Sequence, residues 1–307
     1  MTSPHAPRAT IQLCTYNRAR LLGRVLDACF EQTHPRDDYE IVLVNDGSRD
    51  DTPRVIEAAR TRATCRFTVI EQANAGLARA RNVGIARASG ERIVFIDDDV
   101  LPTPTFVEEH LRSHRAHPFA IVRGAVINTQ SFDRLPTPAW TLANYSGNFF
   151  WTSNVSVPLD MLRRIGNFSE AFREYGWEDI ELGLRLRFAG VRGVFNRFAL
   201  AYHYKPRPRA SDVAGMLRQA GAQARTAVQL HDMHPHWRVT LATGDDALRR
   251  TYHRARRATG ALVRLERAVG DRAAERVLDA RELGAARALA SETYYAELER
   301  VRKTARA

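Results

Sequence analysis

The sequence predicts an α/β protein built on a mostly parallel central β-sheet with helices on both faces. The first part of the 307-residue chain alternates short β-branched runs with longer segments of helical periodicity. In addition, the runs at 41–44 and 93–96 are continuously apolar. Strands with this pattern are typical of parallel sheets that are buried on both faces.

The predicted elements alternate without interruption as far as residue 96. Strands are predicted at 9–14, 40–44, 66–70 and 92–96, and helices at 19–32, 51–62 and 76–88. The helix at 51–62 has Asp51 or Thr52 as its cap. Pro53 lies in its first turn, where the missing N–H costs nothing.

The middle of the chain is less regular, and the last third is helical. Strands are predicted at 119–127, 148–157 and 191–204 (the last as strand or extended chain), a proline-bearing loop at 133–147 and an amphipathic helix at 177–190. The segment KPRPRAS (205–211) interrupts the pattern, and helices follow near 212–230, 244–268 and 271–304. We predict a disordered leader at 1–8, an α/β domain at 9–205 and an arginine-rich helical region at 206–307.

Composition indicates a globular protein of the reducing cytoplasm. Hydrophobic residues make up 44% and charged residues 26% of the chain. No apolar run approaches the roughly 20 residues of a membrane helix, and the N-terminus lacks the apolar core of a signal peptide. The three cysteines, Cys14, Cys29 and Cys65, form no CxxC pair, which disfavours a zinc site or a disulfide framework.

The formal net charge is +11, and most of it lies in the helical region. Residues 206–307 hold 20 Lys and Arg against 12 Asp and Glu, which accounts for +8. Nucleic acid, an anionic membrane or a phosphorylated substrate can each exploit such a charge, and a GC-rich coding sequence explains an arginine bias without function. Acids are interleaved with the bases, as on solvated helix faces, so nucleic acid is disfavoured.

Three polar clusters follow predicted strands. They are TYNR at 15–18, NDGSRD at 45–50 and the aspartates at 97–99. In an open α/β sheet, ligands bind at the carboxyl ends of the strands. Each cluster alone is also compatible with a simple turn, but together they predict one binding edge.

The aspartate triplet Asp97, Asp98 and Asp99 predicts a divalent cation. Adjacent carboxylates repel one another unless a positive charge compensates them, and hard oxygen ligands favour Mg²⁺ or Mn²⁺. The alternative is a helix cap, with Asp99 or Thr103 capping a helix that starts near Pro104.

Three further motifs each admit a structural and a functional interpretation. Arg81, in NAGLARARNVG, contacts phosphate or belongs to a solvated basic face. Trp177, Glu178 and Asp179 either satisfy a helix dipole or take part in carbohydrate chemistry. His203 is a core histidine unless it reaches a metal ion.

Taken in order, TYNR, VNDGS, NAGLARARNVG, FIDDD, TSNVSV, GWEDIELGLRL and AYHY resemble the family 2 glycosyltransferases over residues 9–204. The resemblance implies an inverting enzyme with the Rossmann-like GT-A fold. It also implies a nucleotide-sugar donor and a Mn²⁺ or Mg²⁺ cofactor. The implied acceptor is a carbohydrate, a lipid-linked molecule or a small molecule.

The resemblance also implies roles for individual residues. The nucleotide pocket takes Thr15, Tyr16, Asn17, Arg18, Asp46, Arg81, Asp97 and Asp98; the metal takes Asp99, Asp97 and His203; the sugar or acceptor takes Ser153, Asn154 and Trp177; and catalysis takes Glu178 and Asp179, with Asp179 as base. The expected reaction moves a hexosyl group from a nucleoside diphosphate sugar, most simply UDP-linked, to a hydroxyl group during polysaccharide, glycolipid or natural-product synthesis.

Three other interpretations compete with this one. A catalytically idle relative is disfavoured by the intact DDD and ED motifs. A sugar-nucleotide nucleotidyltransferase needs a glycine-rich basic loop after the first strand, which CTYNRARLLG does not supply. A basic nucleic-acid or membrane-binding module accounts only for the helical region. Within the transferase interpretation, that region docks on a membrane, forms a homodimer or covers the acceptor side of the catalytic domain.

Overall fold

A computed structural model describes residues 6–138, 149–260 and 275–304. The chain forms two compact units. The α/β unit contains residues 1–173 and 178–206, and the helical unit contains residues 207–307 together with the short segment Glu174–Trp177. Of the predicted leader at 1–8 and the predicted loop at 133–147, residues 1–5 and 139–147 lie outside the described residues.

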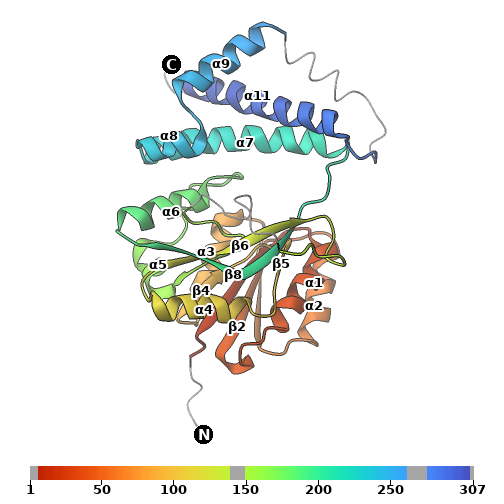
Figure 1. Ribbon diagram of the computed structural model, residues 1–307, viewed down its shortest axis with the longest axis vertical. Helices are drawn as coiled ribbons and strands as arrows, with labels where there is room; N and C mark the ends of the chain where they lie inside the picture. Colours follow the sequence, from red (N-terminus) through yellow and green to blue (C-terminus); the bar gives the residue numbers. More distant parts are fainter. Residues whose placement is uncertain (1–5, 139–148, 261–274, 305–307) are drawn as a thin grey trace. The chain divides into compact units, whose positions relative to one another are not determined.

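One eight-stranded mixed sheet organises the α/β unit, in the order β3-β2-β1-β4-β7-β6-β8-β5 (Figure 1). Its strands are β1 (Ala9–Thr15), β2 (Tyr39–Asn45), β3 (Arg66–Glu71), β4 (Arg92–Phe95), β5 (Val100–Pro102), β6 (Ile121–Thr129), β7 (Val155–Pro158) and β8 (Gly193–Tyr204). The first four strands pair in parallel, as do β6 and β8. The pairs of β7 with β4 and β6, and of β5 with β8, are antiparallel.

Helices cover both faces of this sheet, which confirms the predicted fold class. They are α1 (Ala19–Phe30), α2 (Thr52–Arg60), α3 (Leu77–Arg87), α4 (Phe106–Ala116), α5 (Leu159–Ile165) and α6 (Glu178–Phe188), with a short 3-10 helix η1 (Arg36–Asp38) before β2. Side chains from α1, α2 and α4 join one buried cluster, and those from α3, α5 and α6 join a second. Ile93 belongs to the second cluster and Val94 to the first, because successive strand residues point to opposite faces.

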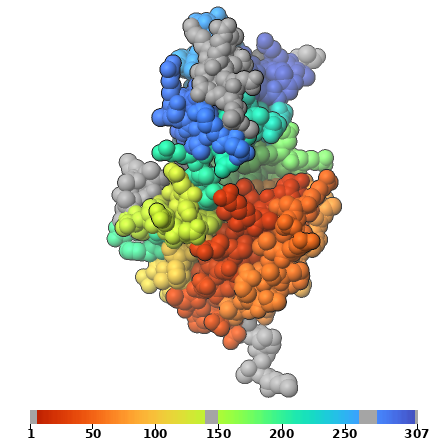
Figure 2. All heavy atoms as spheres, turned by 90° about the vertical axis from the view of Figure 1, so that its right-hand side faces the viewer, coloured from red at the N-terminus to blue at the C-terminus, as the bar shows by residue number. Residues whose placement is uncertain are grey.

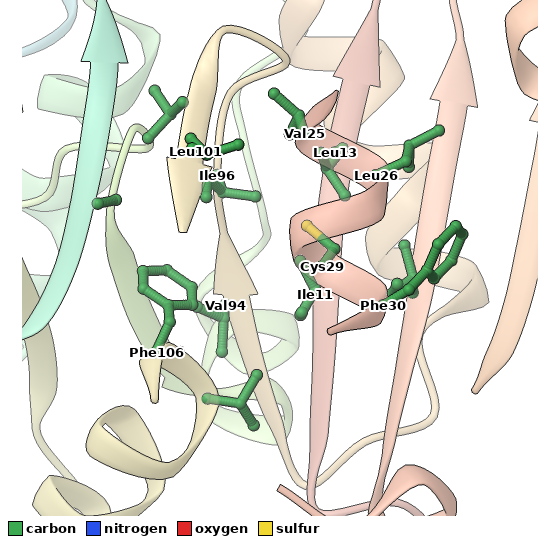
Figure 3. Close-up of a cluster of buried hydrophobic side chains, with 14 of the residues drawn as sticks. Ile11, Leu13, Val25, Leu26, Cys29, Phe30, Val94, Ile96, Leu101 and Phe106 are labelled. Atoms are coloured by element: carbon green, nitrogen blue, oxygen red, sulfur yellow. The ribbon is translucent and has the colours of Figure 1, made fainter. Parts of the chain in front are cut away.

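The core between α1 and the sheet is built from interlocking aliphatic and aromatic side chains. Figure 3 shows Cys29 of α1 beside Ile11 of β1, Leu26 about one turn earlier on the same helix, and Phe106 approaching Val94 of β4. All five are fully buried. Figure 2 shows the N-terminal segments of this unit, red to orange, as one continuous surface. This packing fixes where β1, β2 and β4 end, and therefore where the polar loops begin.

The structure corrects one predicted strand. Residues 148–157 read as a single strand, but β7 includes only Val155–Pro158, and residues 149–154 form turns. The cause is local: Asn154 N donates to Trp151 O, and the Asn154 side chain donates to Ala125 O and Ala199 O of neighbouring strands. Polar side chains at 152–154 thus serve tertiary contacts instead of extending a strand.

The helical unit contains α7 (Asp212–Met233), α8 (Trp237–Thr243), α9 (Ala247–Ala258) and α11 (Ala280–Thr304). A single helix was predicted over 244–268, but the chain turns at Gly244, in the left-handed region, and α9 starts after Asp246, whose side chain caps it by accepting from Arg249 N. The rest of that prediction, beyond Gly260, lies outside the described residues. Among the described residues, no helix is both long and apolar enough to cross a membrane.

The sheet leaves no room for a side chain at Gly124. A Cβ there would meet the carbonyl oxygen of Ala199 and the side chain of Asn154. We expect Gly124→Ala to lower the free energy of unfolding by about 1–3 kcal/mol, because overpacking forces the neighbouring strands to shift. Gly284→Ala in α11 is the matched control, since a Cβ there meets nothing within 4 Å and should add about 0.5–1 kcal/mol of stability. Urea denaturation of both variants measures the difference, and equal midpoints would contradict the prediction.

Candidate functional site

The carboxyl ends of β1, β2 and β4 meet at one edge of the sheet. Thr15 pairs with Asn45 in the parallel register, and Asp46 N donates to Thr15 O at 2.9 Å. On the other side of β1, Ile96 N donates to Gln12 O at 3.2 Å. The three polar clusters predicted from the sequence therefore begin side by side.

The loops after β1 and β2 are tied to each other. Asn17 N donates to Ser48 Oγ at 2.9 Å, and Arg49 N donates to Asn17 Oδ1 at 2.8 Å. Asn17 has a φ of 54°, a left-handed conformation that asparagine tolerates better than most residues. Tyr16, at the top of this arrangement, is 45% exposed, which leaves its ring available to a ligand.

Asp46 is buried and organises the loop after β3. Its carboxylate accepts hydrogen bonds from Gln72 Nε2 at 2.7 Å, Ala75 N at 2.9 Å and Gly76 N at 3.1 Å. Gly47 allows this close approach, because a Cβ there would lie 2.7 Å from the backbone nitrogen of Asn74. Asp46 thus has a structural task in addition to its predicted contact with the nucleotide base.

The aspartate triplet lies in the turn between β4 and β5. Helix α4 begins only at Phe106, and no side chain caps it, so the helix-capping alternative for Asp99 or Thr103 is wrong. The Arg18 guanidinium lies 3.5 Å from both Asp98 and Asp99. A positive group therefore does compensate the triplet, and it comes from the loop after β1.

The three carboxylates differ in environment. Asp97 accepts from Ser153 Oγ at 2.5 Å and from Arg81 at 3.3 Å. Burial raises the pKa of Asp98 to about 7, against the opposing charge of Arg18. Burial also disfavours ionisation of Asp99, but its hydrogen bond with His203 and the charges of His203 and Arg18 outweigh this and lower its pKa.

His203 reaches Asp99 because β8 ends where β5 begins. Val100 pairs with His203, and Tyr204 N donates to Asp99 O at 2.8 Å. His203 Nε2 lies 3.4 Å from Asp99 Oδ1. The sequence alone left open whether His203 is a core residue or lies near a metal site. The structure brings its imidazole next to the Asp99 carboxylate at the turn.

Arg81 joins two motifs that lie far apart in the sequence. It is only 4% exposed, and its guanidinium donates to Glu178 at 2.7 Å, Asp97 at 3.3 Å and Thr152 at 2.6 Å. Burial works against the charged guanidinium, but Glu178 and Asp97 prevail and raise the pKa of Arg81. Arg81 is therefore no member of a solvated basic face.

Thr152 was missing from the predicted site residues. Its hydroxyl is buried and receives one N–H of Arg81. The signal available in the sequence was the polar run of Thr152, Ser153 and Asn154 next to the apolar VSV segment. Ser153 of that run donates to Asp97, whereas Asn154 is 1% exposed and spends its amide on Ala125, Ala199 and His110.

Glu178 and Asp179 open α6 and have different partners. Glu178 is buried in its ion pair with Arg81. Asp179 is partly exposed, and its Oδ1 accepts from Ile180 N. Burial, followed by the negative charge of Glu178, raises the pKa of Asp179 to about 7. A carboxylate of this kind is suited to proton transfer near neutral pH.

The residues directly before this pair belong to the helical unit. Glu174 accepts from Arg225 Nε at 3.0 Å, and Trp177 Nε1 donates to Gln223 O at 2.8 Å. Trp177 has a φ of 70°, and its ring packs on the cluster formed by α7 and α11. Trp177 is thus held through its indole N–H, and its predicted contact with sugar stays a prediction.

The donor atoms at the triplet suit a divalent cation that shares its ligands with a substrate. Within the described residues, no group of three His, Cys, Asp or Glu side chains is arranged as a complete site. Asp99 and His203, however, face each other, and Nδ1 of His203 is buried without a partner. Two protein ligands plus phosphate oxygens and water match the way in which Mg²⁺ is usually held.

Comparisons with known proteins identify the family of the chain. Residues 10–171 match the model of the family described as Glycosyl transferase family 2. The chain is 30% identical over 223 residues to a validoxylamine A glucosyltransferase of Streptomyces hygroscopicus subsp. jinggangensis, a match that covers 61% of this chain and 53% of that protein. The chain spans about half the length of the curated relatives that head this comparison.

Solved structures share the fold. A mannosyltransferase from Pyrobaculum calidifontis, in complex with GDP-mannose and Mn²⁺, superposes with a TM-score of 0.59 at 20% identity, over 96% of this chain and 86% of its own. TarS of S. aureus in complex with UDP-GlcNAc gives a TM-score of 0.55 at 16% identity, over 97% and 92%. At such identities the likeness shows the GT-A fold alone. The family match, which spans more than half of the chain, shows that this protein belongs to glycosyl transferase family 2.

Proposed function

We propose that the protein transfers a hexosyl group from a nucleoside diphosphate sugar to an acceptor hydroxyl, with inversion at the anomeric carbon. The observation that carries this proposal is the division of labour between two adjacent carboxylates. Glu178 is committed to Arg81, whereas Asp179 is partly exposed and has a pKa raised to about 7. One carboxylate thus stays fixed while the other is poised to accept a proton.

The nucleotide binds at the carboxyl ends of β1, β2 and β4. Tyr16 offers an exposed ring for the base, while Thr15, Asn17 and Asp46 shape the pocket around it. The Arg18 side chain is about half exposed. Once a cation compensates the aspartates in its place, Arg18 contacts the diphosphate. Structural neighbours have been solved with GDP-mannose and with UDP-GlcNAc, and we propose a UDP-sugar for this chain.

Asp99 and His203 would hold the divalent cation, whereas the Asp97 carboxylate accepts from Ser153 and Arg81. When bound, the ion neutralises the charge that develops on the departing diphosphate. Asp98 is buried and has a raised pKa, and in this proposal it belongs to the nucleotide pocket. Ser153 keeps Asp97 oriented through a 2.5 Å hydrogen bond. Asn154, which follows Ser153, is buried and donates to the backbone of β6 and β8, and in this proposal it supports the sugar pocket.

In the reaction, the acceptor oxygen attacks the anomeric carbon and forms the new glycosidic bond. The bond between that carbon and the diphosphate oxygen breaks, and its electron pair leaves with the diphosphate. The hydroxyl proton passes to the Asp179 carboxylate. Arg81 holds Glu178 and Asp97 in place, so the base and the cation-binding turn keep a fixed separation.

The acceptor is a hydroxyl group of a polysaccharide, a glycolipid or a natural product. A screen of UDP-, GDP- and dTDP-sugars with Mn²⁺ or Mg²⁺ tests the proposal, because slow donor hydrolysis releases the nucleoside diphosphate even without an acceptor. Release from one sugar nucleotide above all others supports the proposal. No release from any of them, with an intact fold and added acceptor mixtures, would count against it.

We expect Asp179→Asn to lower turnover by about a hundredfold to ten-thousandfold, the usual contribution of a general base. Donor binding, measured by calorimetry, should stay within a factor of two or so, since the amide keeps the shape of the side chain. Asp133→Asn, an exposed acid in the α/β unit, is the control and should leave turnover unchanged. Turnover of Asp179→Asn equal to that of the unaltered enzyme would rule out this base.

The pH dependence of turnover should report the same group. Because Asp179 accepts a proton only when ionised, kcat should rise with pH up to about 7 and fall about tenfold per pH unit below it. Removing the adjacent negative charge with Glu178→Gln should lower the pKa of Asp179 and move this acid limb to lower pH. An acid limb that stays in place in Glu178→Gln would contradict the assignment.

Asp99→Ala should abolish metal-dependent binding of UDP. We expect Mn²⁺ to strengthen UDP binding to the unaltered protein. In the variant, the increase in UDP affinity caused by Mn²⁺ should be lost. Loss of an outer-shell partner lowers metal affinity roughly tenfold to hundredfold, and loss of a direct ligand should cost more. Calorimetric titrations with Mn²⁺ and with a chelator measure both states, with Asp133→Ala as control. An undiminished effect of Mn²⁺ on Asp99→Ala would contradict the metal site.

A further inference from the structure

Helix α9 turns its charged side toward its own unit. His253 Nδ1 lies 2.8 Å from Glu292 Oε1, and Arg257 Nη2 lies 2.9 Å from Glu299 Oε2, both on α11. Glu292 has no exposed side-chain surface. Arg250 pairs in the same way with the buried Asp245. A surface helix normally buries its apolar stripe, so this helix is inverted.

The opposite side of α9 is apolar and exposed. Leu248 is 81% and Tyr252 59% exposed, and Ala255 follows one turn later on the same face. The preceding helix continues the pattern, with Trp237 60% and Leu241 65% exposed. Figure 1 shows α8 and the start of α9 at the same end of the helical unit. Exposed apolar side chains gathered in this way mark an interaction surface.

Basic groups flank these apolar side chains. Helices α8 and α9 together hold six arginines and neither an Asp nor a Glu. The Arg249 and Arg254 side chains are 51% and 65% exposed, although each also lies near one acid. Arg238 stacks its guanidinium over the Trp237 ring at 4.4 Å. We call Trp237, Leu241, Leu248 and Tyr252, with Arg238, Arg249 and Arg254, the α8–α9 surface.

We infer that the α8–α9 surface docks on an anionic lipid bilayer. Leucine, tryptophan and tyrosine side chains enter the interfacial region of a bilayer, while arginines bind the headgroup phosphates. A second copy of the chain is a poorer occupant. Two-fold symmetry would set these arginines against one another, and the nearest acids, Asp246 and Glu299, already pair with Arg249 and Arg254 of their own chain. Nucleic acid is also a poorer occupant, because its phosphate backbone would contact the arginines but would leave the apolar side chains exposed to water.

Docking here places the protein where a lipid-linked hydroxyl acceptor resides. The inference itself depends only on the helical unit and stands apart from the proposed reaction. Its failure would leave the assignment of Asp179 and Asp99 intact. Conversely, an inactive Asp179→Asn variant should still bind vesicles.

Vesicle co-sedimentation of the full-length protein tests the inference. We expect binding to vesicles of phosphatidylcholine mixed with phosphatidylglycerol, and little binding to phosphatidylcholine alone. The pair Leu248→Ser and Tyr252→Ser should lower the partition coefficient at least about tenfold, since both apolar side chains lose their burial in lipid. The pair Arg249→Gln and Arg254→Gln should lower it about fivefold per charge and flatten its salt dependence.

Phe119→Ser is the matched control, because Phe119 is 75% exposed in the α/β unit and should not affect binding. The Tyr252 ring touches His253, so the single variant Leu248→Ser, checked by thermal unfolding, guards against misfolding. Absence of binding to anionic vesicles would overturn the inference, as would unchanged binding by Leu248→Ser and by the double variant. A dimer in sedimentation equilibrium that Leu248→Ser dissociates would also overturn it, in favour of a second copy.

Discussion

The site depends on the interaction of the buried Arg81 guanidinium with its carboxylate and hydroxyl partners. A buried cation is costly unless carboxylates and hydrogen-bond acceptors compensate it, and breaking such a pair is more costly still. Arg81 meets this requirement with Asp97, Glu178 and Thr152, which come from three separate parts of the chain. The same requirement pins the β4–β5 turn to the start of α6. Once the pair forms, Glu178 is occupied, and Asp179 beside it carries a raised pKa because burial, and then the negative charge of Glu178, oppose its ionisation.

The aspartate triplet shows how one constraint leads to the next. Three adjacent carboxylates at a strand end need compensating partners, and Arg81, Arg18 and His203 supply them. Asp97 takes Arg81, Asp98 takes Arg18, and Asp99 shares Arg18 with His203. Because Arg18 comes from the loop after β1, the acids are also linked to the loop interlocked with β2. In the proposed complex, a cation would replace Arg18 beside Asp99 and free Arg18 for the diphosphate, while the buried Arg81 keeps its partners.

In the helical unit, buried ion pairs determine which side chains are exposed at the surface. Asp245 and Glu292 are buried acids that draw His253 and arginines of α9 and α11 inward. The net charge of +8 in residues 206–307 is therefore not one free basic face, since many of its arginines are paired. Turning those groups inward leaves Leu248 and Tyr252 outward. Both units thus use buried ion pairs, but in one they order a candidate site, and in the other they expose an apolar surface.

The sequence by itself determined the α/β class, the order of strands and helices up to β4, and the three polar clusters at the strand ends. These depend on local periodicity and on the rule that ligands meet the carboxyl ends of parallel strands. Tertiary structure decided what periodicity cannot carry: the antiparallel insertion of β7, the turns at 149–154 and the inward orientation of α9. It also decided that Arg81 is buried, that Thr152 supports it and that His203 lies beside Asp99. The physical reason is that the sequence shows the same residue type whether its charged side chain is solvated or buried. Which of the two occurs depends on the partners of that side chain, and here these lie up to 97 residues away in the sequence.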